Sequence, residues 1–152
     1  MVSRELNLGR AGEYLALADI LLKGYQCFDS GQGVGYDLVM EDSEGKLLRV
    51  QVKTTAQKKE WNSDVYQKST ESYFFHIKRA GKNGARHYKE NDFDLYALVM
   101  IDIKQVAYLA NKNIPSASIT LRDKSLKYYN EKGAKYYQDL TLEKAIREIN
   151  VV

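Results

Sequence analysis

Two short apolar segments joined by a turn constrain the fold of this chain more than any other feature. Residues 37–41 and 47–55 are rich in valine, leucine and methionine, and the five residues between them, Asp-Ser-Glu-Gly-Lys, have the composition of a tight turn. The pattern predicts a β-hairpin. Because side chains alternate along a strand, Gln51 and Lys53 share one face while the two neighbouring valines point to the other. The valine face can enter a core, which leaves a lysine displayed on a rigid strand.

Lys53 is the residue of this hairpin that we expect to interact with an anionic group. An ammonium group held against a core costs free energy unless something anionic meets it. Asp37 begins the first strand, and Gln51 shares the face of Lys53. Carboxylate and amide oxygens are ligands for Mg²⁺, and an ammonium group can stabilise charge on phosphoryl oxygens. The three residues therefore suit a metal-dependent attack on a phosphodiester.

Length and composition restrict the class of protein. A chain of 152 residues with 44% hydrophobic and 28% charged residues is long enough for one domain with its own core, so we expect one domain over residues 1–152. A single cysteine, Cys27, excludes an internal disulfide and a multiple-cysteine zinc site, and two histidines do not favour a histidine metal cluster. No apolar run reaches membrane-spanning length and the first residues lack a signal-peptide pattern, so we expect a cytoplasmic protein without a membrane partner.

Basic residues are concentrated in two places, although the net charge is only +3. Residues 78–89 contain five Lys or Arg residues and no acid. Such clusters favour contact with nucleic acid, in which arginines read guanine edges and lysines contact phosphates. Solvated surface loops are an equally good interpretation of a single cluster. The candidate DNA-binding residues are Lys58, Lys59, Lys78, Arg79, Lys82, Arg86, His87 and Lys89.

A helix is predicted over residues 8–23, capped by Gly24. Apolar residues at helical spacing form its stripe, namely Leu8, Ala11, Leu15, Ala18 and Leu22. Glu13 lies on the flank of the helix that carries Ala16 and Ile20, where partial burial favours a partner or a metal. The alternative is a solvated glutamate favoured by the helix dipole.

The rest of the chain predicts mainly strands. The glycine-bearing loop 30–35 lacks the lysine and the following helix of a P-loop, so we interpret it as a loop that lets substrate backbone approach Asp37. Segments 56–71 and 124–138 show no clear periodicity of apolar residues, so no secondary structure is predicted for them. The predicted strands cover residues 25–28, 73–78, 94–103, 105–110 and 118–122, and Thr141 caps a final helix over residues 142–149.

Residues 8 to 110 resemble the PD-(D/E)XK nuclease superfamily, which includes restriction enzymes, archaeal Holliday-junction resolvases and cyanobacterial group I intron-encoded homing endonucleases. The last of these is the nearest likeness. Gly9-Arg10-Ala11-Gly12-Glu13 is similar to the resolvase-type opening, Asp37 matches the first acid of the motif, and Gln51-Val52-Lys53 matches its second half. Tyr36 stands where the motif has proline, and Gln51 stands where it has Asp or Glu. Glu13 could restore the charge that Gln51 removes.

The resemblance implies an α/β fold with a mixed β-sheet flanked by helices. It also implies a Mg²⁺-dependent endonuclease, with Mn²⁺ able to substitute, that cuts double-stranded DNA at specific sites. Glu13, Asp37, Gln51 and Lys53 would be catalytic, the first three as metal ligands. Junction resolution, a restriction role and an inactive DNA-binding module remain alternatives. A further one is an unrelated α/β domain in which Asp37 and Lys53 form a structural ion pair. We expect residues 111–152 to contact DNA or a second subunit, within a homodimer or homotetramer.

Overall fold

The computed structural model describes residues 3–31, 33–60, 71–77, 79–81, 84–86, 92–112, 114 and 117–151. Two α-helices, nine strands and one 3₁₀ turn are found in these parts of the chain. In chain order they are α1 (Arg4–Leu22), β1 (Gln26–Asp29), β2 (Leu38–Glu41), β3 (Leu47–Thr55), β4 (Tyr73–His76), β5 (Arg79–Gly81), β6 (Gly84–Arg86), β7 (Leu95–Met100), β8 (Gln105–Ala110), β9 (Ser118–Leu121), η1 (Tyr137–Asp139) and α2 (Leu142–Asn150).

A five-stranded mixed sheet in the order β1-β2-β3-β7-β8 is the centre of the molecule. The pairs β1–β2, β2–β3 and β7–β8 are antiparallel, whereas β3 and β7 run parallel. Every residue of β7 is buried, as expected for an inner strand covered on both faces. Two further pairs, β4–β9 and β5–β6, are separate antiparallel ribbons. The expected α/β architecture with a mixed sheet and flanking helices is therefore confirmed.

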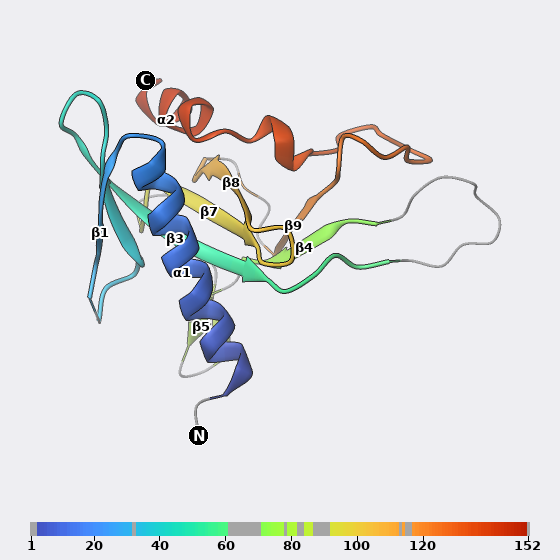
Figure 1. Ribbon diagram of the computed structural model, residues 1–152, viewed down its shortest axis with the longest axis horizontal. Coiled ribbons are helices and arrows are strands. Elements are labelled where there is room, and N and C mark those ends of the chain that lie inside the picture. Colours follow the sequence, from blue (N-terminus) through green and yellow to red (C-terminus); the bar gives the residue numbers. More distant parts are fainter. Residues whose placement is uncertain are drawn as a thin grey trace.

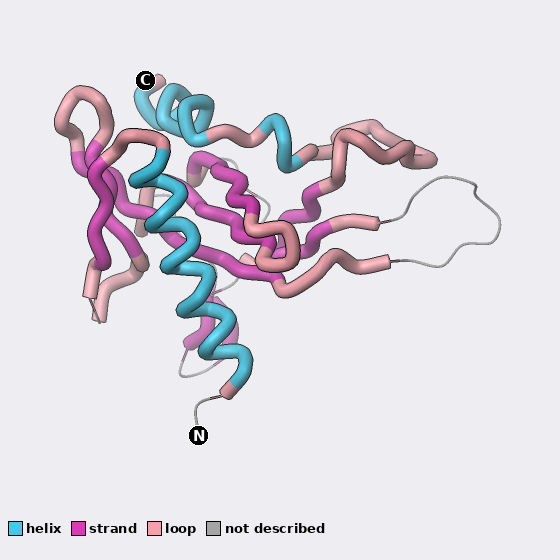
Figure 2. The backbone as a smooth tube through the Cα atoms, in the orientation of Figure 1, coloured by secondary structure: helices cyan, strands magenta, loops and turns pink. Residues whose placement is uncertain are grey.

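The two faces of the central sheet carry different cores. Alternate residues of β3, among them Val50 and Val52, pack with α1 and α2 in one apolar cluster. The other face, which includes Tyr96 and Leu98 of β7, packs against β4 and β9. In Figure 1, α1 crosses over β3, and α2 lies beside the C-terminus. Helix α2 contacts β8, the strand at the edge of the sheet opposite to β1. The tube in Figure 2 shows the loops after β9 reaching beyond the strands. Neither α1 nor α2 combines the length and apolarity that crossing a bilayer requires.

Helix α1 comes unusually close to β3 at Gly12. A Cβ atom built on Gly12 would lie 1.8 Å from Oγ1 and 2.9 Å from Cβ of Thr54. No side chain fits in that space, so glycine is required where the helix crosses the strand. The contact places the next residue of the helix, Glu13, beside the middle of the hairpin.

The predicted apolar stripe of this helix was wrong. The buried residues of α1 are Gly12, Ala16 and Ile20, whereas Leu22 is 87% exposed. Gly12 and Ala16 occupy the part of the buried face that includes the close crossing over β3, and the larger Ile20 follows one turn later. The helix also begins at Arg4, four residues earlier than expected, because the Ser3 hydroxyl accepts a hydrogen bond from the Leu6 N–H and caps it.

Other elements lie near their expected positions. Strand β3 and strand β8 have the predicted bounds, and Thr141 caps α2 through the Lys144 N–H. The segment predicted as a strand over 94–103 is shorter, because residues after Met100 turn towards β8. Strand β9 is not an edge of the main sheet; it pairs with β4 on the second face.

Replacing Gly12 by alanine should destabilise the protein by about 1–3 kcal/mol, because the added methyl overlaps Thr54 and forces α1 away from β3. Urea denaturation followed by circular dichroism measures the change. Gly9→Ala is the matched control: nothing lies within 4 Å of its Cβ position, so this variant should gain about 0.5–1 kcal/mol from lower chain entropy. A Gly12→Ala protein as stable as wild type would contradict the close crossing.

Candidate active site

Asp37 lies at the centre of the group of residues that the sequence pattern singled out. Its backbone is fixed by two hydrogen bonds: its N–H donates to the Val50 carbonyl at 2.9 Å, and its own carbonyl accepts from the Ser30 N–H at 3.0 Å. Its carboxylate Oδ2 accepts from the Val52 N–H and from the Gln51 side-chain Nε2, both at 2.8 Å. The acid is therefore held rigidly against the middle of β3.

Burial raises the pKa of the Asp37 carboxyl, and the nearby charge of Asp29 adds to the effect. The Val52 N–H and the Lys53 ammonium oppose the rise, because both favour the ionised form. Burial likewise lowers the pKa of Lys53, while the attraction of Asp37 raises it in part. Each charge thus compensates some of the desolvation that the other suffers.

Gln51 and Lys53 lie on the same face of β3, as the alternation predicted. This is the face opposite to α1, since the residues that alternate with them pack in the cluster that contains α1. Gln51 is only 8% exposed, and its amide nitrogen donates to Asp37. Its amide oxygen takes no part in that bond and is the atom that could bind a metal.

Glu13 approaches Asp37 from the helix side. Burial raises the pKa of the Glu13 carboxyl first, followed by repulsion from Asp37 and Asp29, while Arg10 lowers it. Both acids line a cavity of about 430 Å³ at the edge of the sheet. Its lining residues are Arg10, Glu13, Tyr14, Asp29, Ser30, Gly31, Gly33, Val34, Tyr36 and Asp37. Gln51 and Lys53 are absent from that lining. The four predicted residues therefore do not line one cavity, but each of the other three interacts with Asp37.

Asp29 is an acid of this cavity that the sequence pattern did not reveal. It ends β1, it accepts a hydrogen bond from the Gly31 N–H at 3.3 Å, and its charge raises the pKa of both Glu13 and Asp37. An isolated acid at the end of an edge strand carries no signal in a sequence. Only the pairing of β1 with β2 brings it to the site.

The donor set fits a divalent cation with few protein ligands. Two mutually repelling, partly desolvated carboxylates and a neutral amide oxygen offer hard oxygen atoms, and a cation between them would relieve the repulsion. Among the described residues, no three His, Cys, Asp or Glu side chains are arranged as a metal cluster. Mg²⁺ commonly keeps several waters and takes only one or two carboxylates, which matches this arrangement.

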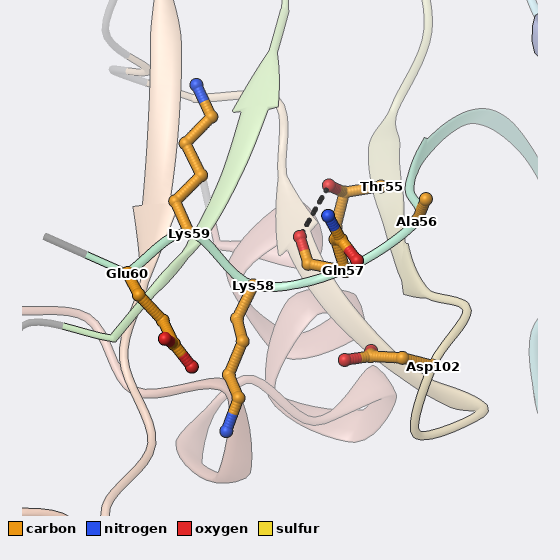
Figure 3. A pocket seen from close by; sticks show the side chains of 7 residues that line it. All are labelled: Thr55, Ala56, Gln57, Lys58, Lys59, Glu60 and Asp102. Carbon is orange, nitrogen blue, oxygen red and sulfur yellow. Dashed lines mark hydrogen bonds between the residues drawn. The ribbon is translucent and has the colours of Figure 1, made fainter.

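Lys58 and Lys59 lie beyond the end of β3, around a second cavity of about 880 Å³. Figure 3 shows their side chains leaving the chain on opposite sides, with Asp102 across the cavity. Lys58 forms an ion pair of 2.6 Å with Glu71, and the Lys59 ammonium lies 4.5 Å from the ring centre of Phe74. Both lysines thus have internal contacts that the sequence did not indicate.

The basic segment 78–89 is described only in part. Strands β5 and β6 pair with Arg79 opposite Arg86. The other candidate DNA-binding residues of this segment, Lys78, Lys82, His87 and Lys89, lie outside the described residues.

Comparison with known proteins adds independent observations. The sequence model of a family described as PD-(D/E)XK endonuclease matches residues 5–143. Among solved structures, the bacterial homing endonuclease I-Ssp6803I is similar at 23% sequence identity, with a TM-score of 0.62, and the match covers 99% of this chain and 100% of that chain. At this identity the likeness concerns the fold. Comparison with curated proteins finds no significant match.

Replacing Gln51 by glutamate should increase the stabilisation that Mg²⁺ gives the protein. The variant exchanges an N–H donor for a second carboxylate beside Asp37, so the metal-free protein becomes less stable and the cation relieves the new repulsion. Thermal denaturation with and without Mg²⁺ measures both effects. Gln105→Glu, a change at an exposed position of β8, is the control and should leave the Mg²⁺ effect unaltered. A smaller Mg²⁺ effect in Gln51→Glu than in wild type would mean that Gln51 does not face the metal.

Proposed function

This chain belongs to the PD-(D/E)XK endonuclease family, and from that premise we propose that it is a metal-dependent, site-specific endonuclease of double-stranded DNA, of the homing type. The observation that carries the proposal is the coupling of Asp37 to Gln51, Lys53 and Glu13 at the edge of the sheet. The overall fold, which is similar to that of a bacterial homing endonuclease, supports the same function.

In this mechanism the four residues have different tasks. A bound Mg²⁺ would supply a positive charge for the phosphoryl oxygens and a more acidic water. Asp37 and Glu13 would hold the cation with their carboxylates, and Gln51 would add its amide oxygen. Lys53, kept near Asp37 on a rigid strand, stabilises the negative charge that grows on the phosphoryl oxygens during in-line attack.

A DNA-binding module without catalysis is the second candidate. Gln51 replaces an acid of the family motif, and the described residues hold no cluster of three metal-binding acids, histidines or cysteines. Cleavage of plasmid DNA in the presence of Mg²⁺ distinguishes the two candidates. Cleavage supports the nuclease, whereas a salt-dependent shift of a duplex without cleavage supports the module.

We further propose that segment 78–89 contacts DNA and that Lys58 and Lys59 add phosphate contacts. The register of β5 and β6 places Arg79 opposite Arg86, so one short ribbon carries both arginines of the segment. A long, specific target is most easily read by identical subunits, so the active form is a homodimer or homotetramer in which residues 111–152 contribute contacts. Sedimentation velocity with and without duplex measures that assembly.

Asp37→Asn and Lys53→Ala should each lower the cleavage rate by at least about 10²–10³-fold. The first removes the negative charge that would bind the metal, and the second removes the positive charge that stabilises the phosphoryl oxygens during attack. Binding of the same duplex in EDTA, measured by fluorescence anisotropy, should change little. Glu44→Gln and Lys46→Ala, in the exposed turn between β2 and β3, are matched controls that remove the same charges at positions without a proposed role. Wild-type turnover in either site variant would overturn the assignment of these residues.

Alanine at Arg79 or Arg86 should relax base preference at one target position at a cost of about 1–3 kcal/mol, since a bidentate contact to guanine is lost. Competition binding with single-base variants of the target measures this. Replacing Lys78 or Lys82 should instead weaken binding to all sequences and lower the salt slope by about one. If neither arginine changes affinity or base preference, segment 78–89 is ordinary surface.

A further inference from the structure

The cavity that contains Glu13 and Asp37 has a basic and aromatic rim. Arg10 and Tyr14 line it from α1, where Arg10 lies three residues before Glu13 and Tyr14 directly follows Glu13. Residues spaced by three and four positions are neighbours on a helix surface, so Arg10 lies beside both Glu13 and Tyr14. The acids of the cavity thus lie beside the guanidinium group of Arg10, to which the sequence pattern assigned no role.

Tyr14 holds Arg10 in place. The Arg10 Nη2 donates to the Tyr14 hydroxyl at 3.2 Å, and the guanidinium carbon lies 6.0 Å from the centre of the Tyr14 ring. The Tyr14 side chain is 57% exposed, and Arg10 is exposed as well. Exposed contacts of this kind add little stability, so the Arg10–Tyr14 contact contributes little to folding.

Arg10 is not neutralised by the acids beside it. Its charge acts on Glu13, yet it forms no ion pair within 4.0 Å with any carboxylate of the described residues. Only one of its N–H groups is used in the described contacts. A guanidinium group has five N–H donors in a fork that matches a phosphate. An external anion can therefore bind without displacing an existing partner.

Two glycines also line the cavity. Gly31 and Gly33 line the cavity with φ angles of +81° and +90°, and nothing lies within 4 Å of the Cβ position of either. A backbone with no side chains at these two points allows close approach of a sugar–phosphate chain.

We propose that Arg10, oriented by Tyr14, binds a backbone phosphate next to the one that is cleaved and so positions the strand over Asp37. The inference rests on the proposed nuclease function. Arg10 lies about 4.5 Å from Glu13 along the helix axis. In this arrangement Arg10 contacts the neighbouring phosphate while the carboxylates face the reacting one.

The first test compares Arg10→Ala with Arg4→Ala, a variant that removes the same charge from the same exposed helix but not from the cavity. With a duplex containing a mapped cut site, Arg10→Ala should bind about tenfold more weakly in EDTA. Its salt slope should fall by about one relative to wild type. Equal behaviour of the two variants would overturn the proposal.

The second test identifies the phosphate. Single methylphosphonate substitutions along the cleaved strand remove one charge at a time, and binding of each duplex is measured with wild type and Arg10→Ala. At one position next to the cut, the methylphosphonate should weaken wild type but leave Arg10→Ala unchanged. If the methylphosphonate weakens binding by wild type and by Arg10→Ala equally at every position, the two changes act independently and the proposed contact is wrong.

The third test addresses Tyr14. Tyr14→Phe removes the hydroxyl that orients the guanidinium group but no charge, so the salt slope should stay at the wild-type value while kcat falls. A wild-type kcat in Tyr14→Phe would overturn the orienting role.

Failure of the proposed nuclease function gives a different result from failure of the Arg10 contact. In that case the wild-type protein itself would leave plasmid DNA uncut in Mg²⁺.

Discussion

Glu13 can meet Asp37 only because Gly12 has no side chain where helix α1 crosses β3. The Cβ position of Gly12 lies 1.8 Å from the Thr54 hydroxyl oxygen, so any other residue would lift the helix away from the sheet. The helix carries Arg10, Glu13 and Tyr14, which line the cavity together with Asp37. One contact between a helix and a strand thus places both acids and the basic rim of the candidate site.

Asp37 then couples the rest of the site through a balance of charge and burial. Desolvation works against its ionised form, whereas the Val52 N–H and Lys53 favour it. The glutamine at position 51 has a physical consequence here, because its Nε2 donates to Asp37 where a carboxylate would repel it. The neutral residue stabilises the acid in the metal-free protein, at the cost of one negative charge for binding Mg²⁺.

The two faces of the central sheet are covered by different elements and carry different residues of the candidate site. Helices α1 and α2 cover one face, and the ribbon β4–β9 covers the other. Gln51 and Lys53 face the second side, where partial burial lowers the pKa of the Lys53 ammonium. Asp37, directly before β2, interacts with Lys53 and also lines the cavity on the helix side.

The amino-acid sequence by itself determined the hairpin, the shared face of Gln51 and Lys53, the cap of α2 and the family, because alternation, capping and short motifs are local properties. It also indicated Glu13, although the stripe expected around it was wrong. The packing of α1 on β3 decides which helix residues are buried: these are Gly12, Ala16 and Ile20, and at Gly12 there is no space for a side chain. Asp29 and the Arg10–Tyr14 pair likewise became visible only in three dimensions. They belong to elements that tertiary packing brings to one cavity, and no spacing along the chain records that packing.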